Sequence, residues 1–305
     1  MEVLNSILPV FLVIIAGRFL YYVNLTGDDF LQGADRLTYY FLFPVMLFWK
    51  TSSGDRVSGQ DLLFSFVCIM AVFLVFLLGL LIIRLSRISR FQAGSFLQSC
   101  FRFNTYVGMA LVITALSDEC VRIFSILIGF VIPFINVISV ASLIAFSNRQ
   151  VSFSEQLRFT LKSLFTNPLI IACFSGMAAS GLVGDFPGFM ESTFRLISYA
   201  ALPVALVSIG GGFSLKGVRS YMGAALGASA VKLLVLPAAG FVCLQTFGFS
   251  TPYIQTGMVF FSLPCATSIY ILSSQLNSDT ELASATIVLS TLLSFFTMSA
   301  VIGFI

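Results

Sequence analysis

The chain has 305 residues, of which 58% are hydrophobic and only 10% are charged, and its formal net charge is +3. Soluble domains carry about 25% charged residues. One soluble core cannot hide this much apolar side chain, so most of the surface must face lipid. The net charge is too small and too scattered to indicate a nucleic-acid partner.

Continuous apolar runs of about 20 residues recur along the chain, and this is the length that a helix needs to cross hydrocarbon. The alternating pattern of a transmembrane barrel is absent from these runs. The sequence therefore predicts an all-α, polytopic membrane protein. Ten transmembrane helices are expected near residues 3–22, 34–50, 62–84, 97–116, 122–146, 165–182, 190–212, 222–247, 252–274 and 281–304.

The ends of the predicted helices indicate how the chain is oriented. The first run begins at Met1 without a basic leader or a small-residue cleavage site, so we expect a retained first span. Basic residues gather after the third, fifth and seventh helices, and such loops face the cytoplasm. We therefore expect a multi-pass protein of the cytoplasmic (inner) cell membrane with both termini outside. The basic residues are Arg84, Arg87, Arg90, Arg149, Arg158, Lys162, Lys216 and Arg219.

The longest polar stretch, residues 148–164, separates two halves of the chain. Leu157 and Leu161 recur there at helical spacing beside the charged Arg158 and Lys162. This pattern is typical of an amphipathic helix lying in the membrane interface. We predict a first five-helix repeat at 1–147, an amphipathic linker at 148–164 and a second five-helix repeat at 165–305.

An internal repeat supports this division. Residues 36–45 read RLTYYFLFPV and residues 195–204 read RLISYAALPV, so five of the ten aligned positions are identical at a spacing of 159 residues. The segments around Gln98 and Gln255 are similar as well. Each half holds five spans, an odd number, so the halves must insert with opposite orientation. Inverted repeats with a site at their interface are a recurring plan of secondary transporters.

The fourth and ninth predicted helices carry polar clusters at matching depth. Pro264 removes a backbone donor and should open the ninth helix, and Gly108 weakens the fourth. Unwound backbone in a membrane is tolerated where it lines a cavity or is covered by protein. The free N–H groups of a broken helix favour an anion. We therefore expect a substrate site formed by Arg102, Asn104, Thr105, Gly108, Ser262, Pro264, Cys265, Thr267 and Ser268.

Two further polar residues, Asn136 and Lys232, are expected to support this site. The alternative for Arg102 and Lys232 is snorkelling, in which the charged head reaches the membrane interface. The chain has no histidine, and its thirteen carboxylates fall near predicted helix ends or loops. Its six cysteines have no paired spacing, which indicates buried, free thiols. We therefore expect no metal, no cofactor and no enzymatic reaction.

Several motifs resemble those of the auxin efflux carrier family. They are the stretch FRFNTYVGMA at 101–110, NPLII at 167–171, ALP at 201–203 and STLLS at 290–294. The resemblance covers essentially the whole chain. The chain resembles bacterial members of this family, which are similar to the plant PIN-formed auxin exporters in their membrane part. The long cytoplasmic loop of the plant exporters is absent. Many relatives also have proline where Ala110 stands.

The resemblance implies a ten-helix inverted-repeat fold, similar to that of the bile-acid sodium symporters. Broken helices 4 and 9 would cross in a transport domain, and helices 1, 2, 6 and 7 would form a scaffold and the interface of a homodimer. It implies elevator-type transport of a small organic anion, such as malate, malonate or an auxin-like acid. The alternative is a membrane-embedded sensor or structural partner of a signalling protein, without net transport.

Overall fold

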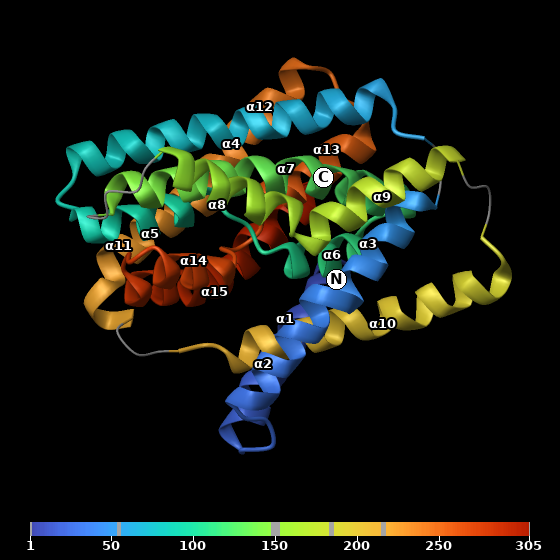
Figure 1. Cartoon of the computed structure of the whole chain (residues 1–305), viewed down its shortest axis with the longest axis horizontal. Coiled ribbons are helices and arrows are strands. Elements are labelled where there is room, and N and C mark those ends of the chain that lie inside the picture. Colours follow the sequence, from blue (N-terminus) through green and yellow to red (C-terminus); the bar gives the residue numbers. More distant parts are fainter. Residues whose placement is uncertain (1, 54–55, 148–152, 183–185, 215–217, 305) are drawn as a thin grey trace.

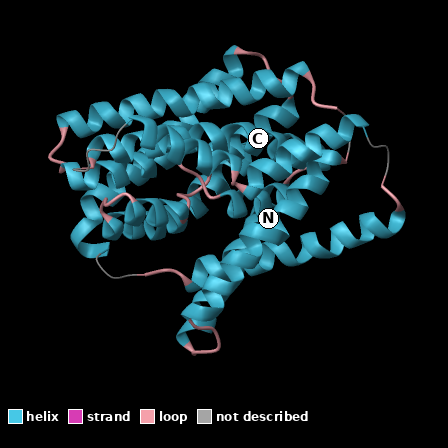
Figure 2. Ribbon diagram, viewed as in Figure 1, coloured by secondary structure: helices cyan, strands magenta, loops and turns pink. Residues whose placement is uncertain are grey.

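The computed structural model describes residues 2–53, 56–147, 153–182, 186–214 and 218–304. Every regular element in these ranges is a helix (Figures 1 and 2). Six described helices are long and apolar enough to cross a membrane. These six are Asn5–Tyr22 within α1 (Glu2–Tyr22), α4 (Gly59–Leu85), α7 (Asp118–Phe146), α10 (Gly188–Gly211), Val218–Thr246 and α15 (Thr280–Phe304).

Three of the four other predicted spans fall on shorter helices, and span 34–50 lies in a continuous helical stretch from Asp28 to Ser52 that is not among the six; the total of ten spans stays a prediction. Predicted span 97–116 is divided in two, as is predicted span 252–274. Span 34–50 corresponds to α2 (Asp28–Leu37), η1 (Thr38–Leu42) and α3 (Phe43–Ser52), and span 97–116 to α5 (Arg90–Phe101) and α6 (Thr105–Ala115). Span 165–182 corresponds to α9 (Pro168–Leu182), and span 252–274 to α13 (Thr251–Ser262) and α14 (Ser268–Gln275).

Two prolines are accommodated by wider, π-helical turns. Pro44 follows η1, and Pro237 follows η2 (Val231–Val235) between α11 (Val218–Ala230) and α12 (Leu236–Thr246). A proline ring clashes with the carbonyl one turn earlier and donates no hydrogen bond. A π-helical turn inserts one residue into the hydrogen-bond ladder and is frequent at functional sites. Helix therefore continues past both prolines, and η2 places Lys232 inside the protein.

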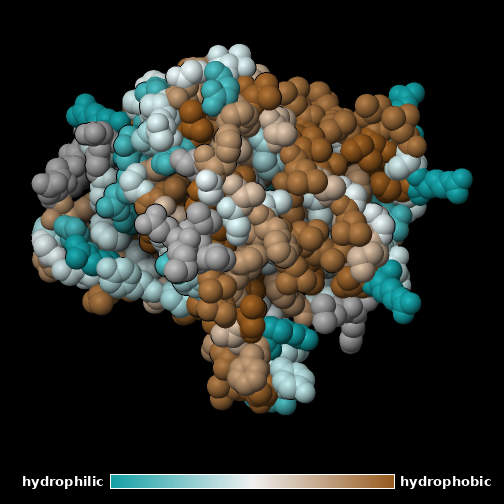
Figure 3. Space-filling model, turned by 180° about the vertical axis from the view of Figure 1, so that it is seen from behind, coloured by the Kyte–Doolittle hydropathy of each residue, from teal (hydrophilic) through white to brown (hydrophobic). Residues whose placement is uncertain are grey.

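The predicted amphipathic linker is helical where it is described. Helix α8 (Phe153–Phe165) exposes both Leu157 and Leu161 together with the charged Arg158. Residues 148–152 of the predicted linker lie outside the described residues. Large apolar side chains are also exposed elsewhere, among them Phe66, Leu81 and Phe296. The back of the molecule shows broad hydrophobic areas with hydrophilic groups toward its edges (Figure 3), as expected for a surface in lipid.

Two helix pairs on one side of the molecule pack at very close range (Figure 1). Helix α1 crosses α10 so closely that a Cβ atom at Gly17 would collide with the backbone of Val207. Helix α9 crosses α3 in the same way, because a Cβ at Gly176 would collide with the backbone of Phe48. Both residues of the second contact lie 159 positions from those of the first, the spacing of the sequence repeat. The remaining long helices pack around α5, α7 and α13.

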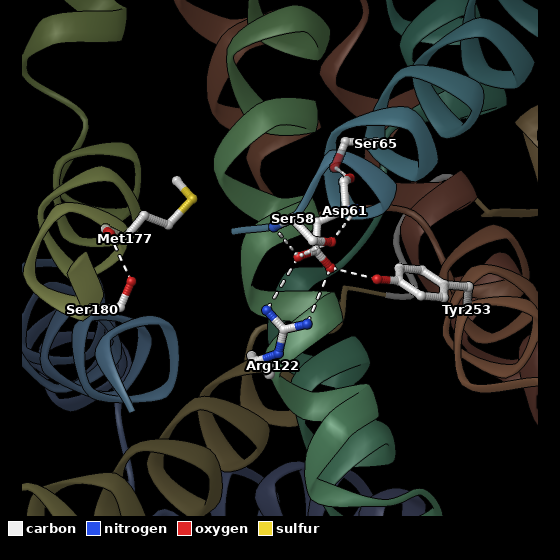
Figure 4. A network of polar contacts seen from close by, with 7 residues as sticks. All are labelled: Ser58, Asp61, Ser65, Arg122, Met177, Ser180 and Tyr253. Atoms are coloured by element: carbon white, nitrogen blue, oxygen red, sulfur yellow. Dashed lines mark hydrogen bonds and ion pairs between the residues drawn. The ribbon is translucent and has the colours of Figure 1, made fainter. Parts of the chain in front are cut away.

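A buried ion pair joins the first turns of α4, α7 and α13 (Figure 4). Asp61 of α4 is 1% exposed and accepts two hydrogen bonds from the Arg122 guanidinium of α7, both 3.2 Å long. Its carboxylate also accepts from the Tyr253 hydroxyl of α13 at 2.8 Å and from the Ser58 amide at 2.8 Å. A carboxylate with this many donors satisfies its lone pairs away from water. The cluster therefore fixes the starts of α4, α7 and α13 relative to one another.

We predict opposite effects for the same substitution at two glycines. Gly17→Ala forces α1 away from Val207 and should cost about 1–3 kcal/mol, the usual range for overpacking. At Gly223 of α11 an added Cβ would meet open space, so Gly223→Ala should stabilise α11 by up to about 1 kcal/mol. Thermal unfolding of both variants in detergent measures the difference. A Gly17→Ala protein as stable as Gly223→Ala would contradict the close crossing of α1 and α10.

The buried ion pair gives a second prediction. Asp61→Asn preserves the shape of the side chain but leaves the Arg122 charge without its counter-ion, which should cost about 3 kcal/mol. Tyr253→Phe removes one hydrogen bond to the same carboxylate and should cost about 1–2 kcal/mol. Melting temperatures of the two variants test this order. Equal losses would mean that charge pairing contributes little to the cluster.

Candidate functional site

The two helix breaks meet inside the bundle. Helix α5 ends at Phe101 and α6 begins at Thr105, while α13 ends at Ser262 and α14 begins at Ser268. The Asn104 amide donates a hydrogen bond of 2.9 Å to the Pro264 carbonyl, so the unwound segments satisfy each other's backbone. The opening predicted at Pro264 is thus seen in the structure.

The break in the fourth predicted helix lies earlier than Gly108. Residues 102–104 are non-helical, and Gly108 is an internal residue of α6. Asn104 begins α6 as its N-cap: its side-chain Oδ1 accepts from the amides of Tyr106 and Val107 at 3.1 and 3.2 Å. Because an asparagine cap stabilises the restart of the helix, no proline is needed at Ala110. Gly108 instead provides room for Leu263 and Phe124, which a Cβ would strike.

A cavity of about 470 Å³ lies beside the crossing. Six of the predicted site residues contribute to its lining: Arg102, Asn104, Thr105, Asn136, Thr267 and Ser268. Asn104 and Arg102 share this cavity only because the chain is extended between them, since residues two apart on an intact helix face different sides. The first residues of α6 and α14 also reach it. The cavity therefore receives the N-terminal ends of two half-helices.

Arg102 is the buried cation of this cavity. Arg102 is only 8% exposed. Its Nη2 donates hydrogen bonds to Asn136 Oδ1 at 3.2 Å and to Ser268 Oγ at 3.0 Å. Its Nε and Nη1 have no hydrogen-bond partner within the described ranges, and no described carboxylate forms an ion pair with it. The guanidinium is held between α7 and α14 and does not snorkel to the interface. Its positive charge therefore lacks a protein counter-ion.

The other predicted site residues lie behind the cavity wall. Ser262 Oγ donates to the Met258 carbonyl within α13, and Cys265 donates its amide to Ser290 Oγ at 3.1 Å. Pro264 contributes its carbonyl to the Asn104 amide, and Gly108 contributes close packing. These residues hold the two breaks in place, and none of them lines this cavity.

Lys232 also lies behind the wall. It is fully buried, midway between Val218 and Thr246, and its Nζ donates to the Phe261 carbonyl at 3.0 Å. Phe261 belongs to the last turn of α13, whose carbonyls have no partner within the helix. Lys232 therefore binds to the carbonyl end of the half-helix. Its side chain is enclosed by protein in this structure.

Part of the cavity lining was not predicted from the sequence. Helix α2 and η1 contribute Asp35 and Tyr39, and Asn167 contributes from the start of α9. Asp35 accepts a hydrogen bond from Ser208 of α10, and Asn167 Oδ1 caps α9 by accepting from the Leu169 and Ile170 amides. The Asn167-Pro168 pair in the NPLII motif was the available signal. The other unpredicted lining residues with polar side chains are Arg36, Tyr40, Tyr106 and Gln275.

Comparison with known proteins agrees with a transport function for this architecture. The model of the family described as "Membrane transport protein" matches residues 2–302. The chain belongs to this family. The predicted relationship to the auxin efflux carriers is thereby confirmed, and the chain is a multi-pass membrane transport protein.

A curated relative is matched over a shorter stretch. A segment of 137 residues is 29% identical to a Rhizobium meliloti (strain 1021) protein named "Putative malonate transporter". The match covers 45% of this chain and 43% of that protein. It therefore spans less than half of the relative's length.

We predict that Asn104→Ala weakens anion binding by roughly ten- to a hundredfold. The substitution removes an amide donor beside the ligand, and a hydrogen bond to a charged group contributes about 1.5–3 kcal/mol. It also removes the N-cap of α6, which costs about 1 kcal/mol of stability. Ser117→Ala removes the N-cap of α7, outside the cavity lining, and is the matched control for stability. Ligand affinity and melting temperature of both variants in detergent test this, and unchanged affinity in Asn104→Ala would contradict it.

Proposed function

We propose that the protein is a secondary carrier that moves a small organic carboxylate across the cytoplasmic membrane. The observation that carries this proposal is the buried guanidinium of Arg102, which lines the cavity without a carboxylate partner in the described part of the chain. A buried cation is costly unless it is paired. An anionic substrate would supply the missing charge while it is bound and remove it when it leaves.

The surroundings of Arg102 favour a carboxylate as the ligand. Each half-helix N-terminus places the positive end of a dipole at the cavity, from Thr105 of α6 and from Ser268 of α14. Asn104 uses its Oδ1 on the backbone, which leaves its amide nitrogen as a donor. A planar guanidinium matches a carboxylate better than a point charge does. The cavity can hold an anion of a few carbon atoms.

The helix packing supports an elevator-type mechanism between two inverted repeats. The close contact of Gly17 with Val207 recurs 159 residues later as Gly176 with Phe48, so two helix pairs are related like the two sequence halves. We propose α1, α2, α3, α9 and α10 as the scaffold and as the interface of a homodimer. The remaining helices, which carry both breaks, would move across it.

The cavity lining also suggests which side it serves. Arg36, Asn167 and Gln275 lie at helix ends that the predicted topology places on the cytoplasmic side, together with the basic loops. We therefore propose that this conformation is accessible from the cytoplasm. Movement of α5, α6, α13 and α14 past the scaffold would carry the site toward the outer side.

The test is uptake of radiolabelled malonate into proteoliposomes. The wild-type protein should transport malonate, and Arg102→Gln should lower its affinity roughly ten- to a hundredfold, because it removes charged hydrogen bonds. Arg195→Gln makes the same substitution at an exposed i,i+4 pair with Glu191 and should transport normally. Binding of malonate without flux would favour the sensor alternative. Normal malonate affinity in Arg102→Gln would overturn the proposed site.

A further inference from the structure

The crossing holds a second buried cation that the proposed binding site does not use. Lys232 is fully buried in η2 and donates to the Phe261 carbonyl at 3.0 Å. None of the ion pairs formed by the described residues involves it. An ammonium group at membrane depth without a counter-ion is costly, and such residues usually serve a function.

Arg102 and Lys232 both lie at the breaks, but their charged groups are placed differently: the Arg102 guanidinium reaches Ser268 at the start of α14, whereas the Lys232 ammonium lies at the end of α13. Arg102 is the C-cap residue of α5, and Lys232 binds at the C-terminal end of α13. The carbonyl ends of α5 and α13 each carry about half a negative charge, and the N-termini of α6 and α14 each carry about half a positive charge. These four partial charges cancel. The crossing is therefore left with two positive charges.

The other charged groups nearby do not remove this excess. Asp35 and Arg36 line the cavity from α2, but their charges are opposite and both belong to the proposed scaffold. Asp61 is paired with Arg122 at the starts of α4 and α7. The group of helices that contains both breaks thus has two buried cations at its centre.

We propose that Lys232 is a specificity-determining residue that makes the site prefer dianions, such as dicarboxylates, over monoanions of the same size. This inference rests on the proposed transport of a carboxylate. Lys232 acts through space from behind the wall, and a dianion with both charges in the cavity neutralises the crossing completely. A monoanion leaves one buried positive charge without a partner.

The expected size of the effect follows from the separation of packed helices. Neighbouring helix axes lie about 10 Å apart. At this distance and an effective dielectric constant of about 20, a unit charge changes affinity by on the order of tenfold for each charge on the ligand. Removing the Lys232 charge should therefore reduce the preference for a dianion over a monoanion by on the order of tenfold.

The experiment compares malonate with its monomethyl ester by calorimetric titration of the detergent-solubilised protein. In neutral buffer the first is a dianion and the second a monoanion of similar size. The wild type should bind malonate more tightly, and Lys232→Met should lower this ratio about tenfold. Lys232→Gln retains a donor for the Phe261 carbonyl but no charge, so it should lower the ratio equally. Thr256→Val, an uncharged change in buried α13, should leave the ratio intact.

The outcomes separate the possible roles of Lys232. Equal loss of both ligands in Lys232→Met, or a normal ratio in Lys232→Gln, would show that the residue only stabilises the end of α13 and would overturn the inference. Malonate binding by the wild type that depends on Arg102 would then still support the proposed function. Wild-type protein that binds neither ligand would overturn both proposals.

Discussion

The hydrogen bond from the Asn104 amide to the Pro264 carbonyl is the contact on which the site depends. A membrane offers no water to an open backbone, so an unwound segment must find partners in the protein. Here the two unwound segments are partners for each other, and Asn104 additionally caps the helix that follows it. Because the breaks are paired, polar side chains can line a cavity while each unwound segment has a backbone partner in the other.

The same arrangement explains the electrostatics of the crossing. Breaking two helices in one place brings two carbonyl ends and two amide ends together, and a cation can bind at a carbonyl end. Lys232 does so directly, whereas Arg102 extends to Asn136 and Ser268 and so reaches the cavity. Rigid packing at Gly17 and Gly176 lies in other helices, away from the breaks. The molecule thus combines tightly packed helix pairs with a bundle in which two broken helices place several polar groups beside a cavity.

Much of the fold follows from the sequence, because long apolar runs and Pro264 act locally. Three features of the site required the tertiary structure. The capping role of Asn104 can be recognised only when the helix is seen to be open at residues 102–104. From the sequence we place the break at Gly108, because glycine weakens helices. Asp35 and Tyr39 approach the cavity through packing between distant segments. Lys232 was ambiguous because a lysine near a helix end can reach water, but the helical segment extends equally far on both sides of it.

The repeated glycine contact has a consequence for the origin of the chain. In a symmetric dimer, residue i of one copy contacts residue j of the other, and j contacts i across the same axis. The pairs Gly17–Val207 and Gly176–Phe48 have this reciprocal form when 159 is subtracted from the positions in the second half. A reciprocal pair of contacts is what two copies of one sequence unit, joined in a single polypeptide, would form when they pack against each other. Each member of such a pair can change independently of its counterpart, and the halves do differ: Phe73, which stands 159 positions before the buried Lys232, is an exposed apolar residue.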